Sequence, residues 1–137
     1  NDERHRLIVS GTVALPWNLR ASTLITLGSG TPFTVFDDST APFTVRWNEG
    51  RAEKKDFIIP NAWAYRSVDL RLEWDTPQIA NAVRIGLVGE VFNVFDFDNG
   101  SNFESFKPRL PSTNARFGQP NAEFNTRRFQ LGLRVDF

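Results

Sequence analysis

The stretch Phe129-Gln-Leu-Gly-Leu-Arg-Val-Asp-Phe137 decides the fold class of this chain. Its odd-numbered residues are all apolar, whereas its even-numbered residues are glutamine, glycine, arginine and aspartate. Because successive side chains of a β-strand point to opposite faces, this alternation predicts a strand with one apolar and one polar face. A tilted strand of roughly 9–11 residues crosses a bilayer, and an apolar outer face with a polar inner face is typical of membrane barrels.

Four earlier segments are also predicted as strands, over residues 6–15, 19–36, 65–74 and 83–95. The alternation is clear in all of them except 19–36, which is assigned from its β-branched residues. Within that segment, Gly28-Ser-Gly30 predicts a bulge or the end of regular pairing. We find no segment with the 3.6-residue period of an amphipathic helix.

The connections between these strands alternate between short and long. Turns are predicted at residues 16–18 and 75–81, and long polar loops at 37–60 and 97–125, with a short strand over 43–47 inside the first loop. Loops longer than about 12–15 residues are unusual in compact soluble domains. Outer-membrane barrels, in contrast, have short turns at one end and long loops at the other.

Charged residues occupy the face opposite the Leu and Val positions of the predicted strands. On the lipid face of a barrel a charge costs on the order of 2–4 kcal/mol at the midplane, so these residues are expected to line a wet interior. Their mixed signs predict ion pairs across strands. The residues concerned are Asp69, Arg71, Glu73, Arg84, Glu90, Arg134 and Asp136. Trp17 and Trp74, at the strand ends, fit an aromatic girdle.

The composition excludes several classes of function. Lys and Arg together number 16, as do Asp and Glu, whereas a nucleic-acid-binding domain shows a basic excess. The single histidine, His5, and the absence of cysteine exclude Cys/His catalysis and multi-His metal sites. Residues 96–100 lack the ligand spacing of a calcium loop. We therefore expect no enzyme, no catalytic residue, no cofactor and no metal.

Five stretches of the sequence resemble one family, in the order in which that family carries them. The most specific is Glu90-Val-Phe-Asn-Val-Phe-Asp96. The others are Arg4-His-Arg-Leu-Ile-Val-Ser-Gly11, Ser29-Gly-Thr-Pro-Phe33, Ser67-Val-Asp-Leu-Arg71 and Gln130-x-Gly132-x-x-Val135-x-Phe137. Together they resemble the C-terminal region of TonB-dependent outer-membrane receptors, of the type with a carboxypeptidase-regulatory-like N-terminal domain.

The resemblance implies that residues 1–137 are the C-terminal segment of a receptor barrel, with the plug domain and the remaining strands elsewhere in a longer protein. A chain that starts at Asn1 and has no methionine fits that interpretation. The expected fold is all-β, an antiparallel up-and-down meander of about five long strands in a transmembrane β-barrel. The expected place is the outer membrane of a Gram-negative bacterium, and the expected partners are its lipid, the barrel-assembly machinery and, through the upstream region, TonB.

By the same resemblance, the whole protein imports a scarce ligand, and this segment supplies barrel wall and an assembly signal. The four residues that match the family's C-terminal assembly signal are Gln130, Gly132, Val135 and Phe137. No ligand contact is assigned, because Arg46, Trp47, Arg51 and Arg116 on the long loops are explained as solvated residues.

Two other interpretations stay open. A passive outer-membrane channel or an adhesin-type barrel needs the same strands but has no plug and no TonB box. A soluble β-sandwich binding module would instead cover the Leu131, Leu133 and Val135 face with a second sheet.

Overall fold

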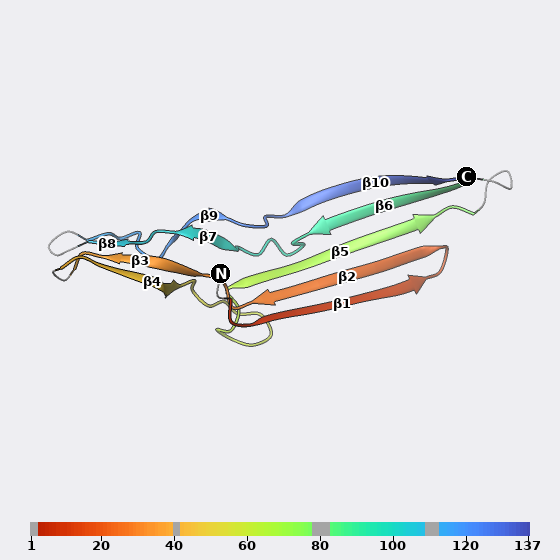
Figure 1. Ribbon diagram of the computed structural model, residues 1–137. Helices are drawn as coiled ribbons and strands as arrows, with labels where there is room; N and C mark the ends of the chain where they lie inside the picture. Colours follow the sequence, from red (N-terminus) through yellow and green to blue (C-terminus); the bar gives the residue numbers. More distant parts are fainter. Residues whose placement is uncertain (1–2, 40–41, 78–82, 109–112) are drawn as a thin grey trace. The chain divides into compact units, whose positions relative to one another are not determined.

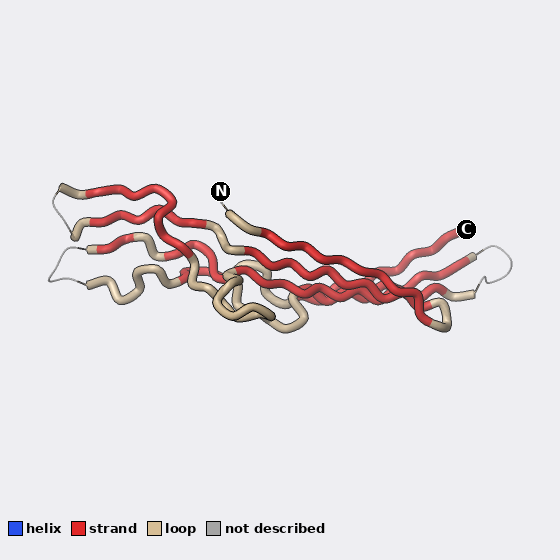
Figure 2. Tube along the Cα trace, turned by 90° about the horizontal axis from the view of Figure 1, so that it is seen from below, coloured by secondary structure: helices blue, strands red, loops and turns tan. Residues whose placement is uncertain are grey.

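A computed structural model of the chain describes residues 3–39, 42–77, 83–108 and 113–137, and all the regular structure in them is strand (Figures 1 and 2). The strands are β1 (Arg6–Leu15), β2 (Leu19–Gly28), β3 (Pro32–Asp37), β4 (Thr44–Arg51), β5 (Tyr65–Asp75), β6 (Arg84–Phe92), β7 (Gly100–Phe103), β8 (Phe106–Lys107), β9 (Pro120–Glu123) and β10 (Arg128–Asp136). The prediction of an all-β chain is confirmed.

The five long strands form one sheet in the order β1-β2-β5-β6-β10. Strands β5, β6 and β10 pair antiparallel, and neighbouring arrows alternate in direction across the whole sheet (Figure 1). Each long strand is therefore hydrogen-bonded to the preceding long strand, which is the predicted up-and-down meander. The sheet is open in the described residues, with β1 and β10 at its edges, so its closure into a barrel stays a prediction.

The short turn after β1 is present as predicted, with Trp17 and Asn18 both in the left-handed region. It is tied to the end of β5, because the Asp75 amide donates to the Asn18 carbonyl at 3.1 Å. The other predicted turn, over 75–81, falls largely on residues 78–82, which lie outside the described residues.

The chain divides into two compact units. The sheet unit contains most of the five-stranded sheet and consists of Leu7–Thr26, Ser67–Phe97 and Asn125–Phe137. The loop unit consists of Asn1–Arg6, Leu27–Arg66 and Asp98–Phe124, and it contains a three-stranded sheet in the order β4-β3-β8 and the pair β7-β9.

The prediction of one strand over residues 19–36 is wrong. Strand β2 ends at Gly28, and β3 belongs to a different sheet. Between them Gly30 has a φ of +78°, and a Cβ built on it would lie 2.8 Å from the Cβ of Ala64. Only glycine combines that backbone conformation with so close a neighbour, so Gly28-Ser-Gly30 marks the end of regular pairing.

The two predicted loops also contain strands that the alternation did not indicate. Strand β4 extends well beyond the short strand predicted over 43–47 and pairs antiparallel with β3. The predicted loop over 97–125 contains β7, β8 and β9, of which β7 and β9 pair antiparallel and β8 pairs parallel with β3. These strands are two to eight residues long, and all of them except β8 carry Pro or Gly, so their period-two patterns are too short to identify them.

Two sets of contacts hold the loop unit together. Leu27, Val35 and Ala64 are buried, and the rings of Phe33 and Phe103 stack with centroids 5.1 Å apart. The buried carboxylate of Asp37, on β3, lies 3.9 Å from both the Arg46 guanidinium on β4 and the Lys107 ammonium on β8. Hydrogen bonds from the hydroxyl and the amide of Ser39 hold the pKa of Asp37 below its ordinary value.

Candidate functional site

The candidate site is the five-stranded sheet itself, beginning with its apolar face. The register aligns apolar residues of β5, β6 and β10 in rows across the sheet, because residues paired in a sheet point to the same side. These rows are Leu70–Val91–Phe129, Leu72–Gly89–Leu131, Trp74–Leu87–Leu133 and Ile85–Val135. The predicted apolar face therefore continues across three neighbouring strands.

These rows are exposed in the sheet unit as described. The exposed fraction is 75% for Phe129, 89% for Leu131, 68% for Leu133 and 102% for Phe137. In the sheet unit, Val68 is the one buried apolar residue among those described. A soluble sheet buries such a face under a second layer, and contiguous apolar surface of this extent marks a site of contact with protein or membrane.

The opposite face carries a ladder of ion pairs. Arg71 on β5 reaches Glu90 on β6 at 2.8 Å and also contacts Glu73 on its own strand. Glu73 in turn accepts from Arg20 on β2 at 3.2 Å. This half of the ladder therefore links three strands.

The second half of the ladder lies nearer the short turns. Arg134 on β10 donates to Asp75 on β5 at 2.8 Å and to Asp136 at 3.0 Å. Seven charged residues form the ladder, five of them from the predicted set and two, Arg20 and Asp75, as their partners. The prediction of cross-strand pairing is confirmed for Arg71 with Glu90. Asp69 is an exception, because its carboxylate accepts from Ser67 and from the Asn93 amide and forms no ion pair in the described chain.

The four predicted assembly-signal residues lie on or next to β10, which is an edge strand with β6 as its partner. Gln130 pairs with Glu90 and Gly132 with Val88, on the polar face. Val135 pairs with Ile85 on the apolar face, and Phe137 follows the strand on the same side by alternation. A Cβ added at Gly132 would meet Val88 at an ordinary 3.5 Å, so packing in this sheet does not require glycine there.

Sequence reasoning missed a buried polar cluster centred on Asn93, which is 0% exposed. The Asn93 side-chain amide donates to the carbonyls of Phe97 and Asn125 at 2.9 and 2.8 Å, and its oxygen accepts from the Phe97 amide at 3.0 Å. Its own backbone amide donates to Asp69 at 2.9 Å. Asn93 therefore joins the chain leaving β6 to β5 and to the residues that enter β10.

Two further contacts complete this cluster. The Ser67 hydroxyl donates to the Asp69 carboxylate at 2.8 Å and accepts from the side-chain amide of Asn125 at 3.0 Å. Asn93 and Asn125 both have positive φ, a conformation that asparagine tolerates better than other residues with a Cβ. In the sequence, Asn93 interrupts the apolar run 91–95, and an asparagine in that position indicates a turn and not a buried polar cluster.

An exposed ion pair lies close to this cluster. The Arg127 guanidinium donates to Asp96 at 2.7 Å, and the Arg127 amide donates to the same carboxylate at 3.3 Å. The hydrogen bond from the Arg127 side chain is the main cause that holds the pKa of Asp96 below its ordinary value. Because the folded state binds a proton less readily than the unfolded state, this pair stabilises the fold above about pH 4 and ceases to do so as the pH falls through the lowered pKa.

We expect Asp96→Asn to flatten the acid limb of the stability profile. Between about pH 6 and about pH 2, the unfolding free energy of the unchanged protein should fall by more than that of the variant, because only the former loses the Arg127 pair on protonation. Denaturant titrations at several pH values measure the difference. Parallel profiles for the two proteins would contradict the assigned role of the pair.

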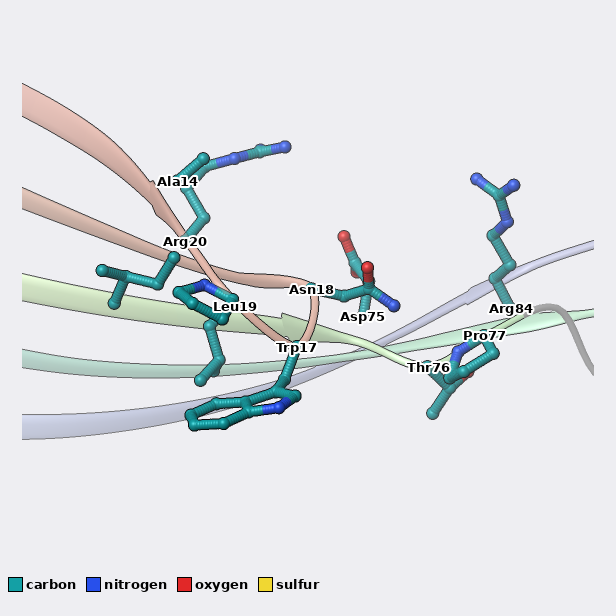
Figure 3. Close-up of a pocket in the computed structure, with 11 residues that line it drawn as sticks. Ala14, Trp17, Asn18, Leu19, Arg20, Asp75, Thr76, Pro77 and Arg84 are labelled. Atoms are coloured by element: carbon teal, nitrogen blue, oxygen red, sulfur yellow. The ribbon is translucent and has the colours of Figure 1, made fainter.

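A hollow of about 590 Å³ lies where the turn after β1 meets the end of β5 (Figure 3). Arg20 and Arg84 extend to one side of the strands there, and the ring of Trp17 lies on the other side. The Trp74 indole donates to the Trp17 carbonyl at 3.1 Å, which places both tryptophans at this end of the sheet. No nucleophile with an adjacent base lines the hollow, and the described residues contain no group of three or more His, Cys, Asp or Glu that could hold a metal ion.

Comparisons with known proteins give no assignment: no family model, no curated protein and no solved structure matches the chain. Among the described residues, no helix is both long and apolar enough to cross a membrane.

Proposed function

We propose that this chain is the C-terminal barrel wall and the assembly signal of a TonB-dependent transporter in the outer membrane of a Gram-negative bacterium. The observation that carries the proposal is the sheet with two unlike faces. One face has exposed apolar rows, as lipid contact requires, and the other carries an ion-pair ladder, as a watery interior requires.

The connections support the same proposal. Strand β2 ends and β5 begins at one end of the antiparallel sheet, and β6 ends and β10 begins at the same end. Both long intervening segments therefore leave from that end. At the other end β1 ends and β2 begins, and β5 ends and β6 begins, with only short intervals of sequence between them. Short turns on the periplasmic side and long segments outside the cell are the arrangement of outer-membrane barrels.

The open edges support a larger assembly. Strands β1 and β10 each have one hydrogen-bonded neighbour in the described chain. Unpaired backbone groups are not tolerated in the hydrocarbon region, so both edges need further strands of a closed barrel. In this proposal β10 closes the barrel against its first strand, and the upstream plug region engages TonB while a scarce ligand is imported.

Removing Phe137, or replacing it with aspartate, tests the assembly role. Because the Phe137 side chain is fully exposed, its removal takes away no buried packing, and we expect the sheet to keep its stability. The amount of receptor inserted in the outer membrane should nevertheless fall several-fold, as measured by surface labelling of whole cells. Unchanged surface levels would show that the terminal aromatic residue is not an assembly signal.

A matched substitution controls for general damage to the C-terminal region. Asp136→Asn changes the neighbouring residue on the polar face and removes one exposed partner of Arg134, whose pairing with Asp75 remains. We expect this variant to insert at the unchanged level. A loss as large as that of the Phe137 variants would mean that the terminus responds to any change.

A further inference from the structure

A strained loop in the loop unit carries two isoleucines into solvent. Ile58 has a φ of +63°, and the Ile59 amide donates to the Phe57 carbonyl at 2.6 Å, which closes a tight three-residue turn. The side chains of Ile58 and Ile59 are 84% and 55% exposed. A positive φ is costly for a β-branched residue, and a turn of this kind is rare.

The rest of this loop, residues 55–63, holds the strained turn in place. Lys55 and Trp63 exchange backbone hydrogen bonds of 2.9 and 3.1 Å at its base. The Asp56 carboxylate accepts from the Asn61 amide at 2.7 Å, and the Asp56 carbonyl accepts from the Arg66 guanidinium at 2.7 Å. Local backbone strain persists only where the surroundings enforce it, and such sites are enriched in functional contacts.

Basic residues flank the apolar tip. Lys54 reaches the Ser29 carbonyl at 3.1 Å and Lys55 lies 3.7 Å from Glu53, so both ammonium groups stay at the base of the loop. Counting the neighbours Arg51 and Arg66, four cations accompany two acids, Glu53 and Asp56. An aliphatic tip with cations behind it has the chemistry of an interfacial anchor, in which the tip enters the acyl boundary and the cations meet lipid phosphates.

We propose that residues 55–63 form a lipid anchor, in which Ile58 and Ile59 insert into the interface of an anionic bilayer and Lys54 and Lys55 lie at its phosphate groups. A lipid surface suits the tip better than a protein partner, because two aliphatic side chains offer far less than the area of a specific protein interface. This inference rests on the proposed function, since it needs the chain to be in a membrane.

Lipid-borne quenching of a single fluorophore tests the anchor. No cysteine occurs in these 137 residues, so Ile58→Cys can be labelled with an environment-sensitive dye in the intact outer-membrane protein reconstituted into phosphatidylglycerol bilayers. Asn102→Cys is the matched control, because Asn102 is also exposed, lies in the loop unit and has a positive φ of 51°. We expect nitroxide-labelled lipid to quench the dye at position 58 several-fold more strongly than at position 102.

Two further arms identify the contact. Exchange of phosphatidylglycerol for phosphatidylcholine, or Lys54→Gln with Lys55→Gln, should weaken quenching at position 58. A dye at position 58 that is shielded from both nitroxide lipid and aqueous iodide would identify a protein partner and overturn the inference.

A label at Leu87→Cys, on the apolar face of β6, separates this inference from the proposed function. Quenching at position 87 together with equal quenching at 58 and 102 would overturn the anchor and leave the barrel proposal standing. Absence of quenching at position 87 would overturn both.

Discussion

Leu87→Arg is expected to prevent stable insertion of the sheet, whereas Val88→Arg is expected to be tolerated. The two residues are neighbours in β6 and point to opposite faces. Leu87 lies between Trp74 and Leu133 in an apolar row, and Val88 lies between Glu73 and Gly132. An arginine near the bilayer midplane on the lipid face costs about 2–4 kcal/mol, whereas a luminal arginine stays hydrated and here lies beside a carboxylate.

The measurement is a folding titration of both variants in lipid bilayers, with the fraction of heat-resistant, folded protein as the readout. The pair is informative because each substitution introduces the same side chain into the same strand. A difference below about 1 kcal/mol would contradict the lipid-facing assignment, since a sheet with water on both faces has no reason to distinguish them. A larger loss of folded protein for Val88→Arg than for Leu87→Arg would mean that the face carrying Val88 contacts lipid and the face carrying Leu87 does not.

Asn93→Leu is expected to destabilise the sheet unit by about 2–4 kcal/mol. Leucine has the same branching at Cγ and is bulkier, but it leaves the Phe97 amide and the carbonyls of Phe97 and Asn125 without their present partners. Each unsatisfied buried group costs about 1–3 kcal/mol, and partial access to water reduces the total. Chemical unfolding followed by tryptophan fluorescence measures the change.

Part of the destabilisation by Asn93→Leu comes from placing leucine in a left-handed backbone conformation, and Asn102→Leu measures that part separately. Asn102 also has a left-handed backbone, with a φ of 51°, but its side chain is exposed on β7. Its substitution therefore reports the cost of a positive φ for leucine without the loss of buried hydrogen bonds. Equal destabilisation by the two substitutions would show that the Asn93 cluster contributes nothing beyond conformation.

The sequence predicts the parts of this fold that depend on residues near one another in the chain, and it does not predict the parts that depend on distant segments. The alternation in residues 129–137 predicts β10 and its apolar face, and, with the three other alternating segments and the β-branched segment 19–36, it predicts the order of the five-stranded sheet. Those features follow from local composition and from a period of two residues. The parallel pairing of β8 with β3 connects segments about 70 residues apart, and no local pattern indicates it.

The candidate site likewise contains an ion pair that the sequence predicts and a buried polar cluster that it does not predict. The pairing of Arg71 with Glu90 follows from which face each residue occupies and from their opposite charges. Asn93 was missed because its importance comes from Phe97 and Asn125, which the fold brings to it from two different segments. The strained backbone at Ile58 could not be predicted either, because isoleucine normally disfavours the positive φ that the surrounding loop enforces.

The ion-pair ladder has a consequence for how this sequence can change. Glu73 contacts Arg20 and Arg71, and Arg71 also contacts Glu90, so altering Glu73 removes the ladder partner of Arg20 on β2, and altering Arg71 removes that of Glu90 on β6. An exchange of Arg71 and Glu90 made in both positions at once preserves the attraction that either single reversal would turn into repulsion. Residues on this face are therefore expected to vary among relatives in concert, whereas the opposite face is free to exchange one aliphatic side chain for another independently.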